Sequence, residues 1–211
     1  MRQVFTERDI PLGGELHVPA GSILTPSARD LAKDRGVTIV ELKKGETLAP
    51  ASAADTVAIG SDHGGFEMKQ KLLPMFGELG LAVRDVGVQE AKAADYPDIA
   101  REVAEMVAGG IVARGVIIDG AGIGSAMVAN KFPGVRAALC YDRATARNSR
   151  EHNDANVLTL GGRLLSITQA EEVLRTWLST PFGGGRHAAR VDKIKEIDKA
   201  NLKWTPPNKT R

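Results

Sequence analysis

From residue 56 to residue 179 the chain alternates short apolar segments with longer amphipathic ones, and this alternation constrains the fold more than any other feature. The apolar segments predict strands over residues 57–59, 81–85, 115–118, 136–140 and 157–160. The amphipathic segments predict helices over residues 66–79, 98–108, 125–131, 142–151 and 168–179, the last with Thr168 as its cap. Such alternation favours an α/β fold, in which a parallel sheet is covered on both faces and the ligand lies beyond the carboxyl ends of the strands.

Residues 1–43 precede this pattern and predict a small β/α extension. Short apolar stretches at 15–18, 23–24 and 37–42 flank a helix signal, in which Thr25 before Pro26 is typical of an N-cap and Gly36 of a helix end. Residues 44–55 are small and polar and contain a proline, which indicates a linker. We therefore expect an extension over 1–43, a linker over 44–55, a main domain over 56–201 and a tail over 202–211.

Composition excludes several classes of protein. The single cysteine, Cys140, rules out an intramolecular disulfide and a cysteine-rich zinc site. The first residues lack the apolar core of a signal peptide, and no uncharged apolar run reaches membrane-spanning length. The net charge of +2 does not indicate nucleic-acid binding. We expect a cytoplasmic protein with neither a nucleic acid nor a membrane as its partner.

Polar and glycine-rich segments follow the predicted strands, at the places where the fold offers a ligand site. They are Gly-Ser-Asp-His-Gly-Gly at 60–65, Asp-Gly-Ala-Gly-Ile-Gly at 119–124 and Gly-Gly-Arg at 161–163. Alternating glycines let backbone N–H groups face a phosphate or an oxyanion, although they also suit a tight turn without a ligand. A dinucleotide site fits poorly, because Ser125 stands where the last glycine of that motif belongs and the loop follows the third strand.

Several side chains near these segments suit a sugar phosphate. Asp62 is able to hydrogen-bond sugar hydroxyls, and His63 to contact a hydroxyl or a phosphate. His152 and Asn153 belong either to such a site or to an ordinary helix end, where histidine complements the dipole and asparagine stops the helix. The last group is arginines. Arg186 and Arg190 lie one helical turn apart and with Arg163 would clamp a phosphate, unless they are merely solvated.

Together and in this order, these motifs resemble type B ribose-5-phosphate isomerases and the related galactose-6-phosphate isomerase subunits. The resemblance covers roughly residues 56–201 and rests on residues 60–66, 95–97, 120–124, 129–131, 149–156, 161–163 and 184–187 with Arg190. It implies a Rossmann-like, three-layer α/β/α fold with a five-stranded parallel sheet. It also implies a dimer or tetramer with active sites at the subunit interface, and neither a metal nor an organic cofactor.

The resemblance also implies a reaction and roles for individual residues. The family opens the sugar ring and moves a proton between C2 and C1 through an enediolate, converting ribose 5-phosphate to ribulose 5-phosphate. His152 is similar to the ring-opening acid and base. The residues similar to sugar contacts are Asp62, Tyr96 and Asn153, and those of the oxyanion cradle are Gly120, Ala121, Gly122, Ile123 and Gly124. The residues similar to the phosphate and ring-opening side, some of them from the partner subunit, are His63, Arg163, Arg186, His187 and Arg190.

The chain departs from the family pattern at the catalytic base. The bacterial ribose enzymes typically have a cysteine base where this chain has Asp119 and a threonine where it has Ala121, and a second subgroup has a glutamate base at the position of Ser125. Asp119 is therefore the candidate base, unless it only hydrogen-bonds a hydroxyl. Alternatives are an isomerase of galactose 6-phosphate or allose 6-phosphate and an inactive sugar-phosphate-binding protein. A dinucleotide oxidoreductase ranks third.

The extension carries a resemblance of its own. Residues 5–10 and 18–31 resemble segments of ethanolamine-utilisation proteins from bacterial microcompartments. This resemblance implies recruitment, through residues 1–43, to a microcompartment shell or cargo protein. The alternatives are a stabilising extension packed on the main domain and a second dimer contact.

Overall fold

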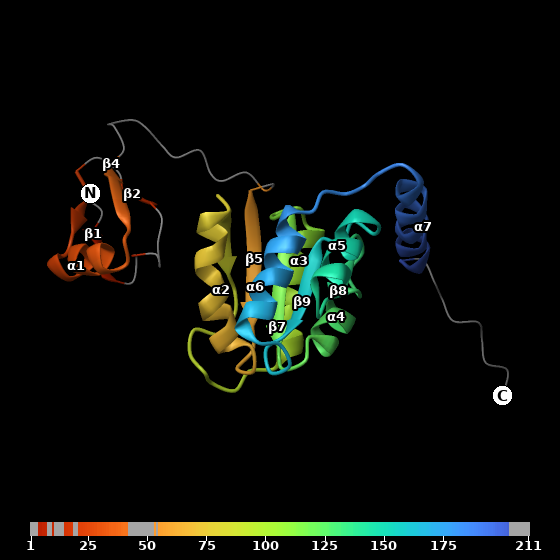
Figure 1. The fold of residues 1–211 in the computed structure, drawn as a ribbon, viewed down its shortest axis with the longest axis horizontal. Coiled ribbons are helices and arrows are strands. Elements are labelled where there is room, and N and C mark those ends of the chain that lie inside the picture. The colour runs from red at the N-terminus through yellow and green to blue at the C-terminus, as the bar shows by residue number, and fades with distance from the viewer. Residues whose placement is uncertain are drawn as a thin grey trace.

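The computed structural model describes residues 4–7, 10, 15–18, 21–41, 53 and 55–202 of the chain. The main domain contains a five-stranded parallel sheet in the order β6-β5-β7-β9-β8 (Figure 1). Its strands are β5 (Thr56–Ser61), β6 (Ala82–Asp85), β7 (Arg114–Asp119), β8 (Ala137–Leu139) and β9 (Val157–Gly161). Its helices are α2 (Phe66–Glu78), α3 (Tyr96–Ala108), α4 (Ile123–Ala129), α5 (Arg143–Glu151) and α6 (Ile167–Ser179). The predicted three-layer α/β/α fold is confirmed.

Two separate cores flank the sheet because successive strand residues point to opposite faces. Ile59 and Ile118 pack with residues of α2 and α6 in one core. Ala58 and Ile117 pack with residues of α3 in the other. Both strands β5 and β7 are buried on both faces, which is why they read as continuous apolar runs in the sequence.

The order of the strands locates the ligand site. From β5 the chain reaches β6 through α2 on one face and then β7 through α3 on the other, so β6 and β7 pair with opposite sides of β5. The switch point of the sheet therefore lies between the carboxyl ends of β5 and β7, where α/β folds of this kind bind ligands. The loops 60–65 and 119–124 leave the sheet at this point.

Some element boundaries differ from the sequence prediction. α4 begins at Ile123 rather than at residue 125, and α3 begins at Tyr96 because Pro97 fits the first helical turn. The prediction that Thr168 caps α6 was wrong. Ser166 accepts from the backbone N–H of Gln169, and the Gln169 side chain accepts from the N–H of Ser166 in return. This reciprocal capping box starts the helix two residues earlier than the Thr168 cap implied.

The extension has its own small core. It comprises β1 (Val4–Phe5), β2 (Glu15–Val18), β3 (Ile23–Leu24), α1 (Pro26–Asp34) and β4 (Thr38–Glu41), with parallel pairs β1–β3 and β2–β4. Thr25 accepts from the N–H of Ala28, and Gly36 ends the helix signal with a φ of 63°, as predicted. The core residues are Ile10, Val18, Leu24, Ala28, Ala32 and Val37. Apart from Ala53 and Asp55, the expected linker lies outside the described residues, as does the expected tail beyond Leu202.

The last described helix is α7 (Arg186–Asn201), which follows the glycines at 183–185. Two hydrogen bonds tie it to the main domain: Gly183 donates to the carbonyl of Glu151, and Gly134 donates to the carboxylate of Asp198. Val191 is buried, whereas Ile194 and Ile197 are exposed. None of the described helices is long and apolar enough to cross a membrane.

Candidate active site

Three loops pack against one another at the carboxyl ends of the strands, and glycines make this packing possible. A Cβ at Gly65 would lie 2.1 Å from the carbonyl oxygen of Ile118, and one at Gly162 would lie 2.8 Å from that of Gly64. The backbone of loop 161–163 also donates to loop 119–124, with Gly162 bonded to Asp119 at 2.7 Å. The three glycine-rich segments singled out in the sequence therefore form one cluster of backbone, which we call the cradle.

Asp62 shapes the first loop of the cradle. Its Oδ1 accepts from the N–H groups of Gly64 at 2.8 Å and Gly65 at 3.0 Å, and the residue is 7% exposed. No hydrogen bond within the described chain uses its Oδ2, which leaves an acceptor for a sugar hydroxyl. His63, the next residue, is exposed on the same loop. Asp62, predicted to contact the sugar, and His63, predicted to contact a hydroxyl or the phosphate, therefore both lie at the cradle.

Asp119 shapes the second loop in the same manner, but both of its oxygens are engaged. Oδ1 accepts from the N–H groups of Ala121 and Gly122, and Oδ2 accepts from the N–H and the hydroxyl of Ser125. The carboxylate therefore anchors the loop to the first turn of α4. This geometry limits the hypothesis that Asp119 is the base, because a base needs a lone pair that faces the substrate. Rotation of the Ser125 hydroxyl would free one lone pair of Oδ2, which still accepts from the Ser125 N–H.

Cys140, the single cysteine of the chain, is a core residue. It is 1% exposed and belongs to a hydrophobic core, as its position in a predicted strand indicated. Burial raises the pKa of its thiol above the ordinary value, so the thiolate is disfavoured.

The anchoring by Asp119 changes which N–H groups of the loop are available to a ligand. Ala121 and Gly122 donate to Asp119, whereas Gly120, Ile123 and Gly124 donate to no group among the described residues. The predicted oxyanion cradle is thus narrowed to these three donors.

Tyr141 is a further residue of this loop that the sequence reasoning missed. Its hydroxyl donates to the carbonyl of Ala121 at 2.8 Å, so it holds the loop from the side of β8. Its signal was available, because it follows a predicted strand directly and is one of only two tyrosines.

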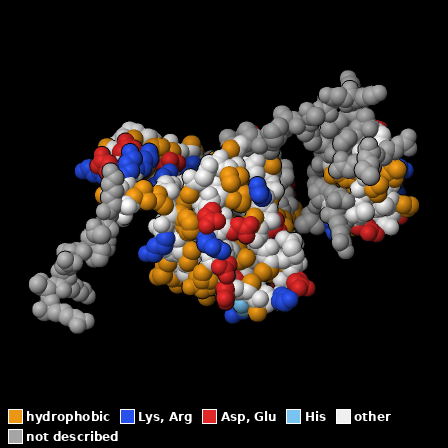
Figure 2. All heavy atoms as spheres, turned by 180° about the vertical axis from the view of Figure 1, so that it is seen from behind, with side chains coloured by type: hydrophobic (Ala, Val, Ile, Leu, Met, Phe, Trp, Pro, Cys, Tyr) orange, Lys and Arg blue, Asp and Glu red, His pale blue; other side chains and the backbone are white. Residues whose placement is uncertain are grey.

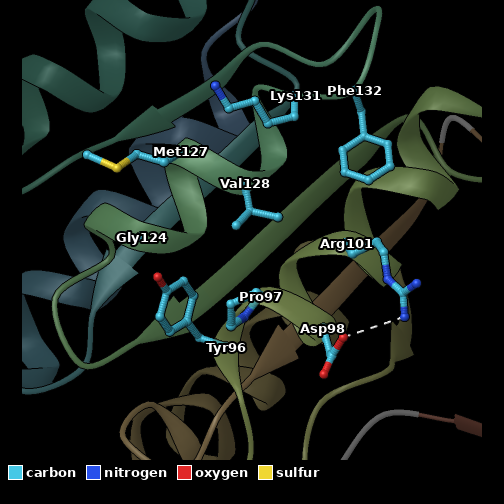
Figure 3. A pocket seen from close by; sticks show the side chains of 9 residues that line it. All are labelled: Tyr96, Pro97, Asp98, Arg101, Gly124, Met127, Val128, Lys131 and Phe132. Carbon is cyan, nitrogen blue, oxygen red and sulfur yellow. Dashed lines mark ion pairs between the residues drawn. The ribbon is translucent and has the colours of Figure 1, made fainter.

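Tyr96 connects the cradle to an apolar groove between α3 and α4. A Cβ at Gly124 would lie 2.5 Å from the Tyr96 ring, so this glycine lets the ring approach α4 closely. Figure 3 shows the ring at one end of the groove and Phe132 at the other, with the ion pair of Asp98 and Arg101 alongside. The groove has a volume of about 380 Å³. Tyr96 therefore lies both against the cradle, at Gly124, and in the lining of the groove.

The second group of predicted residues gathers where α5 ends and α7 begins. The imidazole rings of His152 and His187 are stacked, with centroids 4.1 Å apart and planes 7° from parallel. Asn148 lies one turn earlier on α5, and its amide nitrogen is 2.9 Å from Nδ1 of His152. Arg186 and Arg190 stand on the first turns of α7 beside this pair. We call this group the histidine cluster.

Within one chain the cradle lies at the carboxyl ends of the strands and the histidine cluster at their amino ends. α5 starts beyond the carboxyl end of β8 and runs back to its amino end, where Arg136 donates to the carbonyl of Asn153. A strand such as β7, with six residues, is about 15–20 Å long, and this length separates the two groups. In Figure 1 the loops of the cradle lie at the lower ends of the strands, and α7 begins near the level of their upper ends.

This separation corrects one expectation from the sequence. Arg163 belongs to the cradle, where its N–H donates to Gly120 at 3.0 Å, whereas Arg186 and Arg190 belong to the histidine cluster. The three arginines therefore do not form a phosphate clamp within a single chain.

Comparisons with known proteins agree with this fold. A family model described as Ribose/Galactose Isomerase matches residues 57–194. The chain belongs to this family. It is 41% identical over 142 residues to ribose-5-phosphate isomerase B of Escherichia coli, which covers 67% of this chain and 95% of that protein. It is 36% identical over 140 residues to D-erythrulose-4-phosphate isomerase of Pectobacterium atrosepticum, which covers 66% of this chain and 92% of that one.

A solved structure extends the similarity to three dimensions. Ribose-5-phosphate isomerase B of Clostridium thermocellum is 46% identical and superposes with a TM-score of 0.67, covering 69% of this chain and 99% of that one. The match of the family begins at residue 57, so the extension lies outside it.

Proposed function

We propose that this protein is an aldose–ketose isomerase of a phosphorylated sugar and that ribose 5-phosphate is its substrate. The observation that carries the proposal is the cradle of this family member. There, at the switch point of the sheet, three N–H groups and Oδ2 of Asp62 have no hydrogen-bond partner among the described residues. Backbone donors of this kind stabilise the oxyanion of an enediolate. Membership of the family and the similarity to ribose-5-phosphate isomerases B support the choice of substrate.

We assign the proton transfers to two residues. His152 gives a proton to the ring oxygen and takes the proton of the anomeric hydroxyl, which opens the sugar ring. Asp119 then removes the proton from C2 through Oδ2 and returns it to C1, while the Ser125 hydroxyl rotates out of the way. Asp62, Tyr96 and Asn153 hold the sugar. Arg163 on one side and Arg186 and Arg190 on the other bind the phosphate, with His63.

The division of the site supports a homodimer. Since the cradle and the histidine cluster of one chain are about 15–20 Å apart, a second copy is needed to bring one of each together. A two-fold axis would create two such sites. The apolar groove beside Tyr96 supplies a surface for this contact, because Ile123 and Met127 on α4 are exposed next to it. Figure 2 shows hydrophobic side chains gathered on one flank of the main domain.

The extension supports a separate role. It has its own core and lies outside the family match, so the isomerase fold does not depend on it. We propose that residues 1–43 recruit the enzyme to a microcompartment shell or cargo protein. Capture of purified shell proteins by the full chain, but not by a chain that starts at Asp55, is the expected result. Equal capture by both chains would refute this role.

Proton exchange in deuterated water tests the isomerase function directly. The protein is incubated with ribose 5-phosphate, galactose 6-phosphate, allose 6-phosphate or erythrulose 4-phosphate, and deuterium incorporation beside the carbonyl is followed by NMR. We expect fast exchange and conversion with ribose 5-phosphate. Faster conversion of another sugar would reassign the substrate. Binding without exchange of any sugar would favour a sugar-phosphate-binding protein instead.

A further inference from the structure

The histidine cluster contains one ring more than the ring-opening step requires. His152 is a C-terminal residue of α5 and is partly exposed, whereas His187, in the first turn of α7, is only 9% exposed. With their centroids 4.1 Å apart and their planes nearly parallel, the face of His187 lies against the face of His152. Much of the surface of His187 is therefore unavailable to a substrate.

Hydrogen bonds distinguish the two rings. His152 has a polar neighbour at each ring nitrogen: the Asn148 amide nitrogen is 2.9 Å from Nδ1, and a carboxylate oxygen of Glu151 is 3.9 Å from Nε2. Nδ1 of His187 is buried and has no partner among the described residues. A protonated His187 would bury an N–H without an acceptor, which is costly, whereas a neutral ring with its proton on Nε2 avoids this cost.

The charges around His187 act in the same direction. Burial lowers its pKa most, and His152 on α5 and Arg186 and Arg190 on α7 lower it further. Glu151 on α5 acts in the opposite sense. His187 therefore stays neutral as the pH falls toward the range in which an ordinary histidine becomes charged, about 6.5.

We propose that His187 is a positioning residue for His152: its neutral ring, stacked face to face on the His152 ring, fixes the orientation of that ring. This inference rests on the proposed function, because it concerns the acid and base of ring opening. It differs from the expectation that His187 contacts the phosphate. Two charged imidazoles at this separation would repel each other, so a neutral His187 avoids that repulsion when His152 takes up a proton.

Two substitutions of His187 separate positioning from phosphate binding. His187→Ala removes the stacked surface, and we expect kcat for ribose 5-phosphate to fall about tenfold with KM changed by less than about twofold. His187→Phe keeps a flat neutral ring and restores most of that loss. If both variants instead raise KM strongly and to the same extent, His187 contacts the substrate and the positioning role is overturned.

NMR titration of the substrate-free protein tests the same inference without any turnover. The imidazole signals are followed against pH and assigned with the His152→Ala and His187→Phe variants. We expect the His187 signals to be those of a neutral ring at a pH of about 6.5, where an ordinary histidine is half charged, because the pKa of His187 is lowered. A His187 ring that is half charged at or above that pH would overturn the inference. Because no sugar is present, this outcome is independent of whether ribose 5-phosphate is the substrate.

Discussion

The cradle and the histidine cluster are built in opposite ways. In the cradle, backbone groups and buried carboxylates satisfy one another: Asp119 alone accepts from Ala121, Gly122 and Ser125. In the histidine cluster, side chains stand at helix ends, and His187 has a buried nitrogen without a partner in the part of the chain that the structure describes. A single chain thus completes the part of the site that must be rigid. It leaves His152, His187 and the arginines of α7 at the other end of the strands, where under our proposal a second chain covers them.

Removing the acid of the histidine cluster is expected to have the largest effect. His152→Ala eliminates general acid–base catalysis of ring opening, so kcat should fall by about 10²–10⁴-fold. Steady-state assays with ribose 5-phosphate measure this loss. Arg175→Ala on α6, which removes an exposed ion pair with Glu78 on α2, serves as the control and should leave kcat within about twofold. Turnover by His152→Ala close to that of the control would contradict the assignment.

Subunit mixing tests whether the two halves of a site come from different chains. His152→Ala and Asp119→Asn are each expected to be nearly inactive alone. After denaturation and refolding together, random pairing gives half heterodimers, each with one intact site, so about a quarter of the wild-type activity should return. An inactive mixture that contains heterodimers would mean that each site is built from one chain.

The rigidity of the cradle is tested by adding a methyl group. At Gly65 a Cβ would lie 2.1 Å from the Ile118 carbonyl, which as strand backbone has little room to move, so Gly65→Ala should destabilise the protein by about 1–3 kcal/mol or more. Gly77→Ala is the matched control, since that helical glycine has open space around it and should gain about 0.5–1 kcal/mol. Denaturant unfolding measures both. Equal effects at the two positions would argue against a tightly packed cradle.

A single hydroxyl tests how strongly the loop is held from the side of β8. Tyr141→Phe removes the bond to the Ala121 carbonyl and should cost about 1 kcal/mol of stability. Because that bond holds the oxyanion loop, kcat/KM is expected to fall several-fold. Unfolding and kinetic measurements check the two effects. If kcat/KM is unchanged although stability falls, Tyr141 supports the fold but does not position the loop.

The smallest effect is expected from removing the extension. A chain that starts at Asp55 keeps both halves of the site, and the solved relative from Clostridium thermocellum is covered to 99% by 69% of this chain. Its kcat and KM should therefore stay within about twofold of the full chain. A large loss of activity would show that residues 1–54 contribute to the site or to the dimer.

The fold and the cradle were predictable because their signals are local. The alternation of strands and helices, the Thr25 cap and the glycines at strand ends each depend on neighbours in the sequence. The cap of α6 was mispredicted for a related reason, since Ser166 and Thr168 are both good caps and only the reciprocal bond with Gln169 distinguishes them. The bond of Tyr141 to Ala121 joins residues 20 positions apart, which no local pattern reports.

The sequence by itself determined the family, the layers of the fold and the residues that gather at the cradle. Only the tertiary structure decided how those residues are used. It showed that both carboxylate oxygens of Asp119 accept hydrogen bonds from its own loop, since hydrogen-bond partners depend on where the backbone turns. It also showed that His152 lies at the amino ends of the strands, because α5 must return to those ends before β9 can begin. Position in space, unlike residue type, depends on the whole path of the chain.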